Sequence, residues 1–167
     1  YYKCLKINPK KYEAYNNLGN IFKDKYEIES AVENYLYCLE INSDYKIALQ
    51  NFGVCLQSYK FSKISHIVEK HIINLIEKNR ILRPVDVITS LISYLYLDKE
   101  FNFIVKNYNN YSLDTLLDKF LNFKILIKLL EITPITDIQI ENLLRYLRYK
   151  ILLNITKIKN KNIASKV

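Results

Sequence analysis

Glycine and proline are scarce in this chain, which contains 2 glycines, 3 prolines and no methionine or tryptophan in 167 residues. Folds made of many strands and tight turns depend on glycine and proline, so their scarcity argues against a β-rich protein. Runs of 18 or more apolar residues are also missing, since even the stretch from Ile125 to Ile132 is interrupted by Lys128 and Glu131. The sequence therefore predicts an all-α protein without a transmembrane span or a signal peptide.

Sequence signatures of catalysis and of metal binding are lacking as well. No glycine-rich loop is present to bind phosphate, and no Cys-x-x-Cys or His-x-x-x-His pair is present to bind a metal. His66 and His71 are five residues apart, which on a helix turns them about 140° from each other. We therefore expect both histidines at the surface or partly buried, and we expect neither catalytic residues nor a cofactor.

The formal charge of +8 is confined to one end of the chain. Residues 1–141 contain 18 basic and 17 acidic side chains, whereas residues 142–167 contain 7 basic and no acidic ones. A solvated helix face accounts for such a local excess without any bound phosphate. Nucleic acid is therefore disfavoured as a partner.

A spacing of 34 residues recurs in the first third of the chain. The segment from Tyr1 to Pro9 aligns with the segment from Tyr35 to Ser43. Four positions of the next expected helix also recur: Tyr15, Leu18, Gly19 and Phe22 align with Leu49, Phe52, Gly53 and Leu56. Glycine inside a helix costs about 1 kcal/mol relative to alanine, so we expect a neighbouring helix to approach closely at these glycines. The period itself predicts stacked helical hairpins.

Residues 12–45 resemble the tetratricopeptide repeat (TPR) family. The resemblance rests on an ordered pattern of large, small and aromatic side chains: Tyr15, Leu18, Gly19, Phe22, Ala31, Tyr35 and Cys38. Two positions depart from the family, because Lys25-Tyr26 stands where a glycine is usual and Ser43 replaces the closing proline. The resemblance implies a short α-solenoid of antiparallel hairpins over residues 1–60. These residues would hold the second half of one unit, a full unit at 12–45 and the first helix of the next.

Helical patterning continues beyond residue 60, but the strict period does not, since Glu69 stands where the repeat needs an aromatic residue. We expect a helical extension at 61–157 with four helices, whose apolar stripes cover 64–76, 87–95, 112–130 and 140–152, followed by a basic tail at 158–167. Pro84 and Ser112 mark two of the helix starts, and Thr136 with Gln139 fits a capping box at the last.

Cysteine usage favours a cytoplasmic protein. The chain has three cysteines, and two of them, Cys4 and Cys38, occupy equivalent repeat positions at which a small side chain packs between helices. Buried free thiols fit a reducing compartment.

Amide side chains gather on the face that would line the concave groove of a TPR array: Asn16, Asn17, Asn20, Gln50 and Asn51. Asn17 and Asn51 are 34 residues apart. They match the asparagine that, in the superhelix of O-linked N-acetylglucosamine transferase, forms a ladder and holds an extended peptide. A carboxamide can meet the C=O and N–H of a peptide together, so the resemblance implies peptide binding with little sequence preference. The alternative is that these are ordinary polar residues on a solvated helix face.

Three functions stay open at this point. The first is an interaction module without catalysis that binds a protein or peptide segment in the groove. The second is the substrate-presenting part of a larger transferase, because Ile132 to Ile155, with Asp137 after a proline, resembles the helical segment that follows TPR arrays in bacterial transferases (methyl-, glycosyl- or sulfotransferases). Its catalytic domain would lie beyond Val167. The third is contact of the basic C-terminal helix with nucleic acid or an anionic membrane. The oligomeric state is not indicated.

Overall fold

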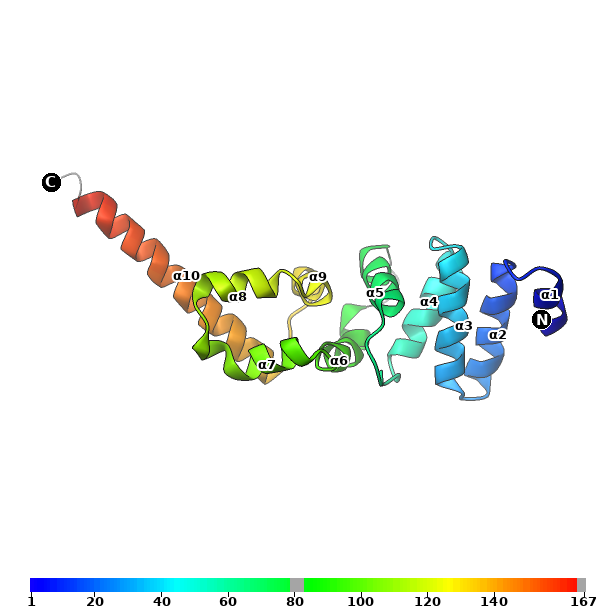
Figure 1. Cartoon of the computed structure of the whole chain (residues 1–167). Helices are drawn as coiled ribbons and strands as arrows, with labels where there is room; N and C mark the ends of the chain where they lie inside the picture. The colour runs from blue at the N-terminus through cyan, green and yellow to red at the C-terminus, as the bar shows by residue number, and fades with distance from the viewer. Residues whose placement is uncertain (79–82, 165–167) are drawn as a thin grey trace.

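Helices make up nearly all of the structure. The computed structural model describes residues 1–78 and 83–164, which form ten α-helices and one short 3-10 helix, with no strand among them. The predicted all-α class is therefore confirmed. The molecule is elongated, with α1 to α5 following one another from one end and the two termini at opposite ends (Figure 1). None of the described helices is both long enough and apolar enough to cross a membrane.

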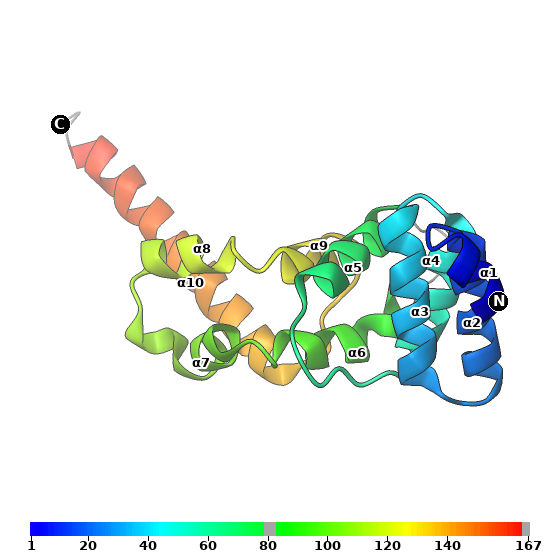
Figure 2. The same ribbon diagram turned by 45° about the vertical axis from the view of Figure 1, so that its right-hand side comes forward.

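The first half of the chain forms five helices: α1 (Tyr2–Ile7), α2 (Tyr12–Asp24), α3 (Ile28–Ile41), α4 (Lys46–Leu56) and α5 (His66–Lys78). Consecutive helices from α1 to α5 pack against each other, and in addition α2 packs against α4 and α3 packs against α5. The antiparallel course of α2 and α3 is visible in Figures 1 and 2.

Close packing of α2 on α3 is centred on Gly19. A Cβ atom added to Gly19 would lie 2.5 Å from Cε1 of Tyr35, a ring that is fully buried. Real Cβ atoms do not approach a neighbouring carbon so closely, so only glycine fits here unless the Tyr35 ring moves. The close helix approach expected at this glycine is thus present. Of the other repeat positions, Leu18, Ala31, Cys38 and Gly53 are buried, whereas Tyr15 and Phe22 are partly buried and pack against the core.

The turn between α2 and α3 ends α2 with a left-handed residue. Tyr26 has a φ of 63° and is the one residue other than glycine with positive φ in the described chain. Around it, the N–H of Glu27 donates to the carbonyl of Phe22 and the N–H of Tyr26 donates to that of Lys23, both at 2.9 Å. This is the Schellman arrangement, which usually places glycine at the left-handed position. Tyr26 therefore occupies a site that favours glycine.

The hairpin packing continues past residue 60 because α5 repeats the buried pattern of α3 in a shifted register. Val68, Ile72 and Leu75 of α5 are buried, and each lies 37 residues after a buried residue of α3: Ala31, Tyr35 and Cys38. The connection at 57–65 is longer than the turn at 25–27, and this accounts for the three additional residues. The position expected for Glu69 in the repeat is consequently taken by Ile72.

The second half of the chain contains more helices than the four expected after the repeats. Counting from α5, the described residues form six, and those after α5 are α6 (Pro84–Leu95), α7 (Lys99–Asn107), α8 (Leu113–Phe120), α9 (Lys124–Ile132) and α10 (Ile138–Ala164), with the 3-10 helix at Tyr108–Asn110. The starts predicted at Pro84 and Ser112 are correct, since Pro84 is the first residue of α6 and the Ser112 hydroxyl accepts from the N–H of Thr115.

Two corrections concern helix boundaries. The helix expected at 112–130 is broken at 121–123, because Phe123 turns inward and packs edge-on against Phe101 with ring centroids 5.0 Å apart. The break lets α9 return and pack against α5 and α6. The start of α10 is capped by Asp137 rather than Thr136, since Asp137 Oδ1 accepts from the N–H groups of Gln139 and Ile140 at 3.0 and 2.9 Å. Of the expected tail, 158–164 belong to α10 and 165–167 lie outside the described residues.

Candidate functional site

Three of the five groove candidates are hydrogen bonded to one another between helices. The Nδ2 amide of Asn51 on α4 donates to Oδ1 of Asn16 and of Asn20 on α2, both at 3.1 Å. The Tyr35 hydroxyl on α3 donates to the same Asn20 oxygen at 2.8 Å. Asn16 is only 3% exposed. These side chains therefore join α2, α3 and α4, and both N–H donors of the Asn51 amide are used within the fold.

The other two groove candidates, Asn17 and Gln50, are partly exposed. No side-chain hydrogen bond formed by the described residues involves either of them. Asn17 and Asn51 thus differ in their hydrogen bonding, although the sequence places them at equivalent repeat positions. Peptide binding by a ladder of the two stays a prediction, and within it only Asn17 has an unengaged amide.

A pocket that the sequence analysis missed lies between α3, the connection 57–65 and α5. It has a volume of about 380 Å³, within the range of small-ligand and side-chain binding pockets. Its lining comes from three segments: Glu29, Val32, Glu33, Leu36, Tyr37 and Glu40 of α3; Tyr59, Phe61, Ser62, Lys63 and Ser65 of the connection; and Ile67 and Val68 of α5. The longer connection that shifts the repeat register therefore also builds one wall of the pocket.

The aromatic wall of this pocket is held in place by α6. Phe61 packs edge-on against Tyr59 and against Tyr94 of α6, each with ring centroids 4.8 Å apart. The Tyr94 hydroxyl donates to the Ser65 carbonyl at 3.0 Å and accepts from the Ser65 N–H at 3.1 Å, while the Ser90 hydroxyl donates to the Tyr59 carbonyl. Because both ends of the connection are bonded to α6, the wall is formed before any ligand arrives.

The rim of the pocket on α3 is acidic. Glu29, Glu33 and Glu40 are exposed and line its mouth, against a single basic lining residue, Lys63. No ion pair among the described residues involves Glu29 or Glu33. Burial raises the pKa of the Tyr59 phenol, and the charges of Glu29 and Glu33 raise it further. The mouth therefore combines apolar surface with uncompensated negative charge.

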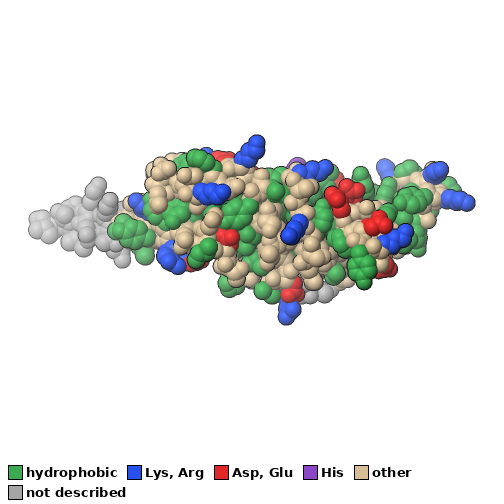
Figure 3. All heavy atoms as spheres, turned by 90° about the horizontal axis from the view of Figure 1, so that it is seen from below, with side chains coloured by type: hydrophobic (Ala, Val, Ile, Leu, Met, Phe, Trp, Pro, Cys, Tyr) green, Lys and Arg blue, Asp and Glu red, His purple; other side chains and the backbone are tan. Residues whose placement is uncertain are grey.

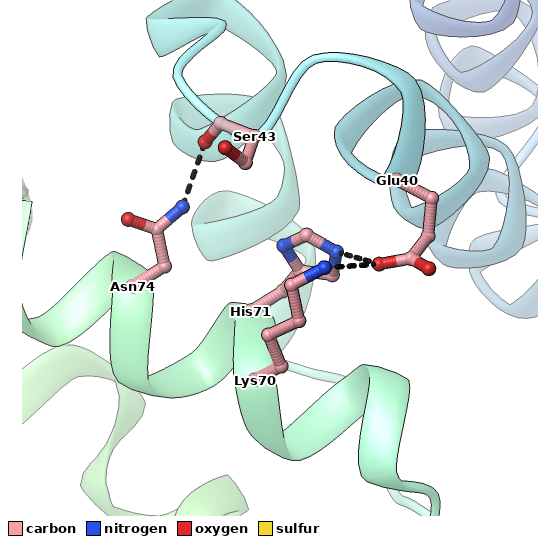
Figure 4. Close-up of polar contacts among 5 residues, drawn as sticks. All are labelled: Glu40, Ser43, Lys70, His71 and Asn74. Carbon is pink, nitrogen blue, oxygen red and sulfur yellow. Dashed lines mark hydrogen bonds and ion pairs between the residues drawn. The ribbon is translucent and has the colours of Figure 1, made fainter.

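At the far end of this rim, Glu40 ties α3 to α5 (Figure 4). Its Oε1 atom accepts from Lys70 Nζ at 2.9 Å and lies 2.7 Å from His71 Nε2. The Asn74 amide adds a hydrogen bond to the Ser43 carbonyl at 2.7 Å. Lys70 and His71 together lower the pKa of the Glu40 carboxyl, so Glu40 is ionised at neutral pH.

His71 is fully buried, which corrects the expectation of a surface or partly buried residue. Burial lowers the pKa of its imidazole, and this outweighs the opposite effect of Glu40. Its Nδ1 atom is buried without a hydrogen-bond partner among the described residues. A neutral ring with its proton on Nε2, donated to Glu40, satisfies this geometry. The position of His71 inside the α3–α5 junction explains why spacing alone did not reveal it.

The cysteine thiols and the potential metal ligands of the described chain do not form a second candidate site. Burial raises the pKa of the Cys38 thiol to about 12, and it also raises the pKa of Cys55. In the described part of the chain, no three His, Cys, Asp or Glu side chains are grouped so that they could hold a metal ion.

Comparison of the chain with protein-family models, with curated proteins and with solved structures gives no match. The acidic-rimmed pocket is therefore the candidate site that the geometry favours most.

Proposed function

We propose that this chain is a TPR-type protein-interaction module without catalysis of its own, and that the pocket between α3 and α5 receives an apolar side chain of a partner segment. The repeat assignment is supported by the Gly19–Tyr35 contact and by the left-handed residue at the α2–α3 turn. The observation that carries the binding proposal is the pocket itself, which is apolar inside, open to solvent and walled by a connection bonded to α6.

The energetics of such a site come from apolar surface that is already assembled. Tyr37 and Ile67 line the pocket and are 59% and 45% exposed, so a partner side chain would cover surface that the fold leaves in water. Burying one leucine-sized side chain contributes about 1.5–3 kcal/mol. Little of this is lost to ordering the site, because its wall is fixed beforehand.

The amide face of α2 and α4 does not carry this proposal. Asn16, Asn20 and Asn51 are bonded to one another, and a peptide would have to displace those bonds before using the amides. Presentation of a bound segment to a catalytic domain beyond Val167 is compatible with the pocket as the binding site.

Selection of peptides from a displayed random library tests the proposal. Peptides that bind the full chain are expected to bind the double variant Tyr37→Ala, Ile67→Ala about tenfold or more weakly, since both exposed pocket residues are lost. The matched control is Ile47→Ala, Val54→Ala, which removes two exposed apolar side chains of α4 outside the pocket. If the selected peptides ignore the pocket variant and lose affinity with Asn17→Ala, the binding site is the amide face and the proposal is wrong.

A further inference from the structure

The C-terminal part of α10 includes a run of exposed side chains at residues 151–155. It projects beyond α7 and α8 in both ribbon views (Figures 1 and 2). Apolar residues that would normally be covered are exposed there, among them Ile151 and Ile155, which lie one turn apart on the same face. Such a stripe at the end of a projecting helix is typical of a segment that docks into a partner.

The charge of this segment is opposite to that of the pocket rim. Residues 142–167 carry 7 basic and no acidic side chains, whereas Glu29 and Glu33 stand at the mouth of the pocket without a basic partner in the described chain. On the face shown in Figure 3, the larger groups of acidic side chains lie in the half of the molecule away from the C-terminal end. Complementary charge of this kind fixes orientation and speeds association.

The shape of the molecule determines whether the end of α10 can reach the pocket of its own chain or only the pocket of another copy. The pocket is formed near the N-terminal half, and the end of α10 points away from it at the opposite end of the elongated molecule, so the two cannot meet within one chain (Figure 1). Pairing of two α10 ends with each other would bring together segments that contain only positive charge. Like charges in contact oppose such pairing.

We infer that the projecting end of α10 from a second copy docks in the pocket between α3 and α5, with an apolar side chain in the pocket and lysines beside Glu29 and Glu33. The inference rests on the proposed function, because it assigns an occupant to the same site. A contact between two different surfaces of identical chains is head-to-tail and is not closed by a two-fold axis. The chain would therefore form dimers and longer assemblies as its concentration rises.

Sedimentation velocity of the full chain measures this association. The rim variant Glu29→Gln, Glu33→Gln and the tail variant Ile151→Ser, Ile155→Ser are each expected to weaken self-association about tenfold. Raising the salt concentration is expected to weaken it in the wild type, since exposed charges are screened. The control Asp114→Asn, Asp118→Asn removes the same charge from α8, far from the pocket, and is expected to associate as the wild type does.

Mixing the two variants gives the decisive result. A rim variant retains an intact α10 and a tail variant retains an intact pocket, so an equimolar mixture is expected to form dimers that neither variant forms alone. A mixture that stays monomeric, or association that is lost in the tail variant and retained in the rim variant, would overturn the inference. A wild type that is monomeric at millimolar concentration would overturn it too. Continued binding of the selected peptides at Tyr37 and Ile67 would then show that only the occupant, and not the proposed function, is wrong.

Discussion

Protonation of a single residue, His71, is coupled to the packing of α5 on α3. With its Nε2 proton donated to Glu40, the ring has only Nδ1 left to protonate, and that atom is buried without an acceptor in the described chain. Burial accordingly lowers the pKa of His71 below its usual 6.5. The hydrogen bond and charge of Glu40 act in the opposite direction but are outweighed, and the charge of Lys70 lowers the pKa further. A second proton on the ring would be an unsatisfied buried donor.

The pH dependence follows from this direction. The unfolded chain binds a proton at His71 near pH 6.5, and the folded chain binds it only at lower pH, so the unfolded state holds more protons in between. The free energy of unfolding is therefore expected to fall as the pH drops from 7 to 5.5, above the range in which Glu40 titrates. Urea titrations across this range should show a smaller slope for His71→Gln. His66→Gln, which alters an exposed histidine of the same helix, should keep the full slope, and an unchanged slope in His71→Gln would refute the assignment.

Tyr26 offers a stabilising substitution. Its φ of 63° costs a non-glycine residue about 1–2 kcal/mol, and its side chain is 89% exposed and so contributes little packing. Glycine removes the backbone cost but adds freedom to the unfolded chain, so Tyr26→Gly is expected to raise the free energy of unfolding by about 0.5–1 kcal/mol. Chemical denaturation measures the change. Lys25→Gly, at the neighbouring position with φ −88°, is expected to lower it instead, and the same sign for both variants would contradict this account of the turn.

Between helices, the amide cluster holds α2 and α4 together, which changes the expected result of removing the asparagines. Asn51→Ala leaves the buried Oδ1 of Asn16 without a donor, so it is expected to lower the free energy of unfolding by about 1–3 kcal/mol. Asn17→Ala removes no such bond and should stay within about 0.5 kcal/mol of the wild type. Thermal and urea unfolding of the two variants test this. Equal stability of both would mean that the cluster contributes nothing to the fold.

A helix is predictable from the sequence where local spacing defines it, and it is not predictable where a contact with a distant segment sets its boundary or register. The apolar positions of α2 and α3 follow from helical spacing, and the close contact at Gly19 follows from a glycine inside a helix. Neither the 37-residue register of α5 nor the break before Phe123 could be predicted in this way. The first depends on the length of a connection that packs on α6, and the second depends on a contact with Phe101 from another helix.

The pocket escaped prediction for the same reason. Its acidic and apolar residues on α3 could be seen as one face, since Glu29, Glu33, Leu36 and Glu40 are spaced at three or four residues and multiples of a turn. The opposite wall, however, exists only because Tyr94 and Ser90 bond the connection in place. Bonds between segments about 30 residues apart leave no periodic signal in the sequence.

Across the whole molecule, α2 packs chiefly on α3, whereas α9 packs on α5 and α6 and α10 packs on α7 and α8, so local stability should vary along the chain rather than being uniform. At one end, α1 has no buried residue, and at the other end α10 is exposed from Ile151 to Ile155. Between them, α3 and α4 contain the fully buried Tyr35 and Phe52.

Amide hydrogen exchange of the full chain is expected to follow this order. Amides of α1 and of residues 151–155 in α10 should exchange fastest, because they open without disturbing the core, and those of α3 and α4 should exchange only on global unfolding. Asn51→Ala serves as the internal check: by weakening the α2–α4 contact it should speed exchange in α2 more than in α9, which packs on α5 and α6 instead. Equal acceleration in all helices would show that the chain unfolds as one cooperative unit and that stability is not passed from neighbour to neighbour.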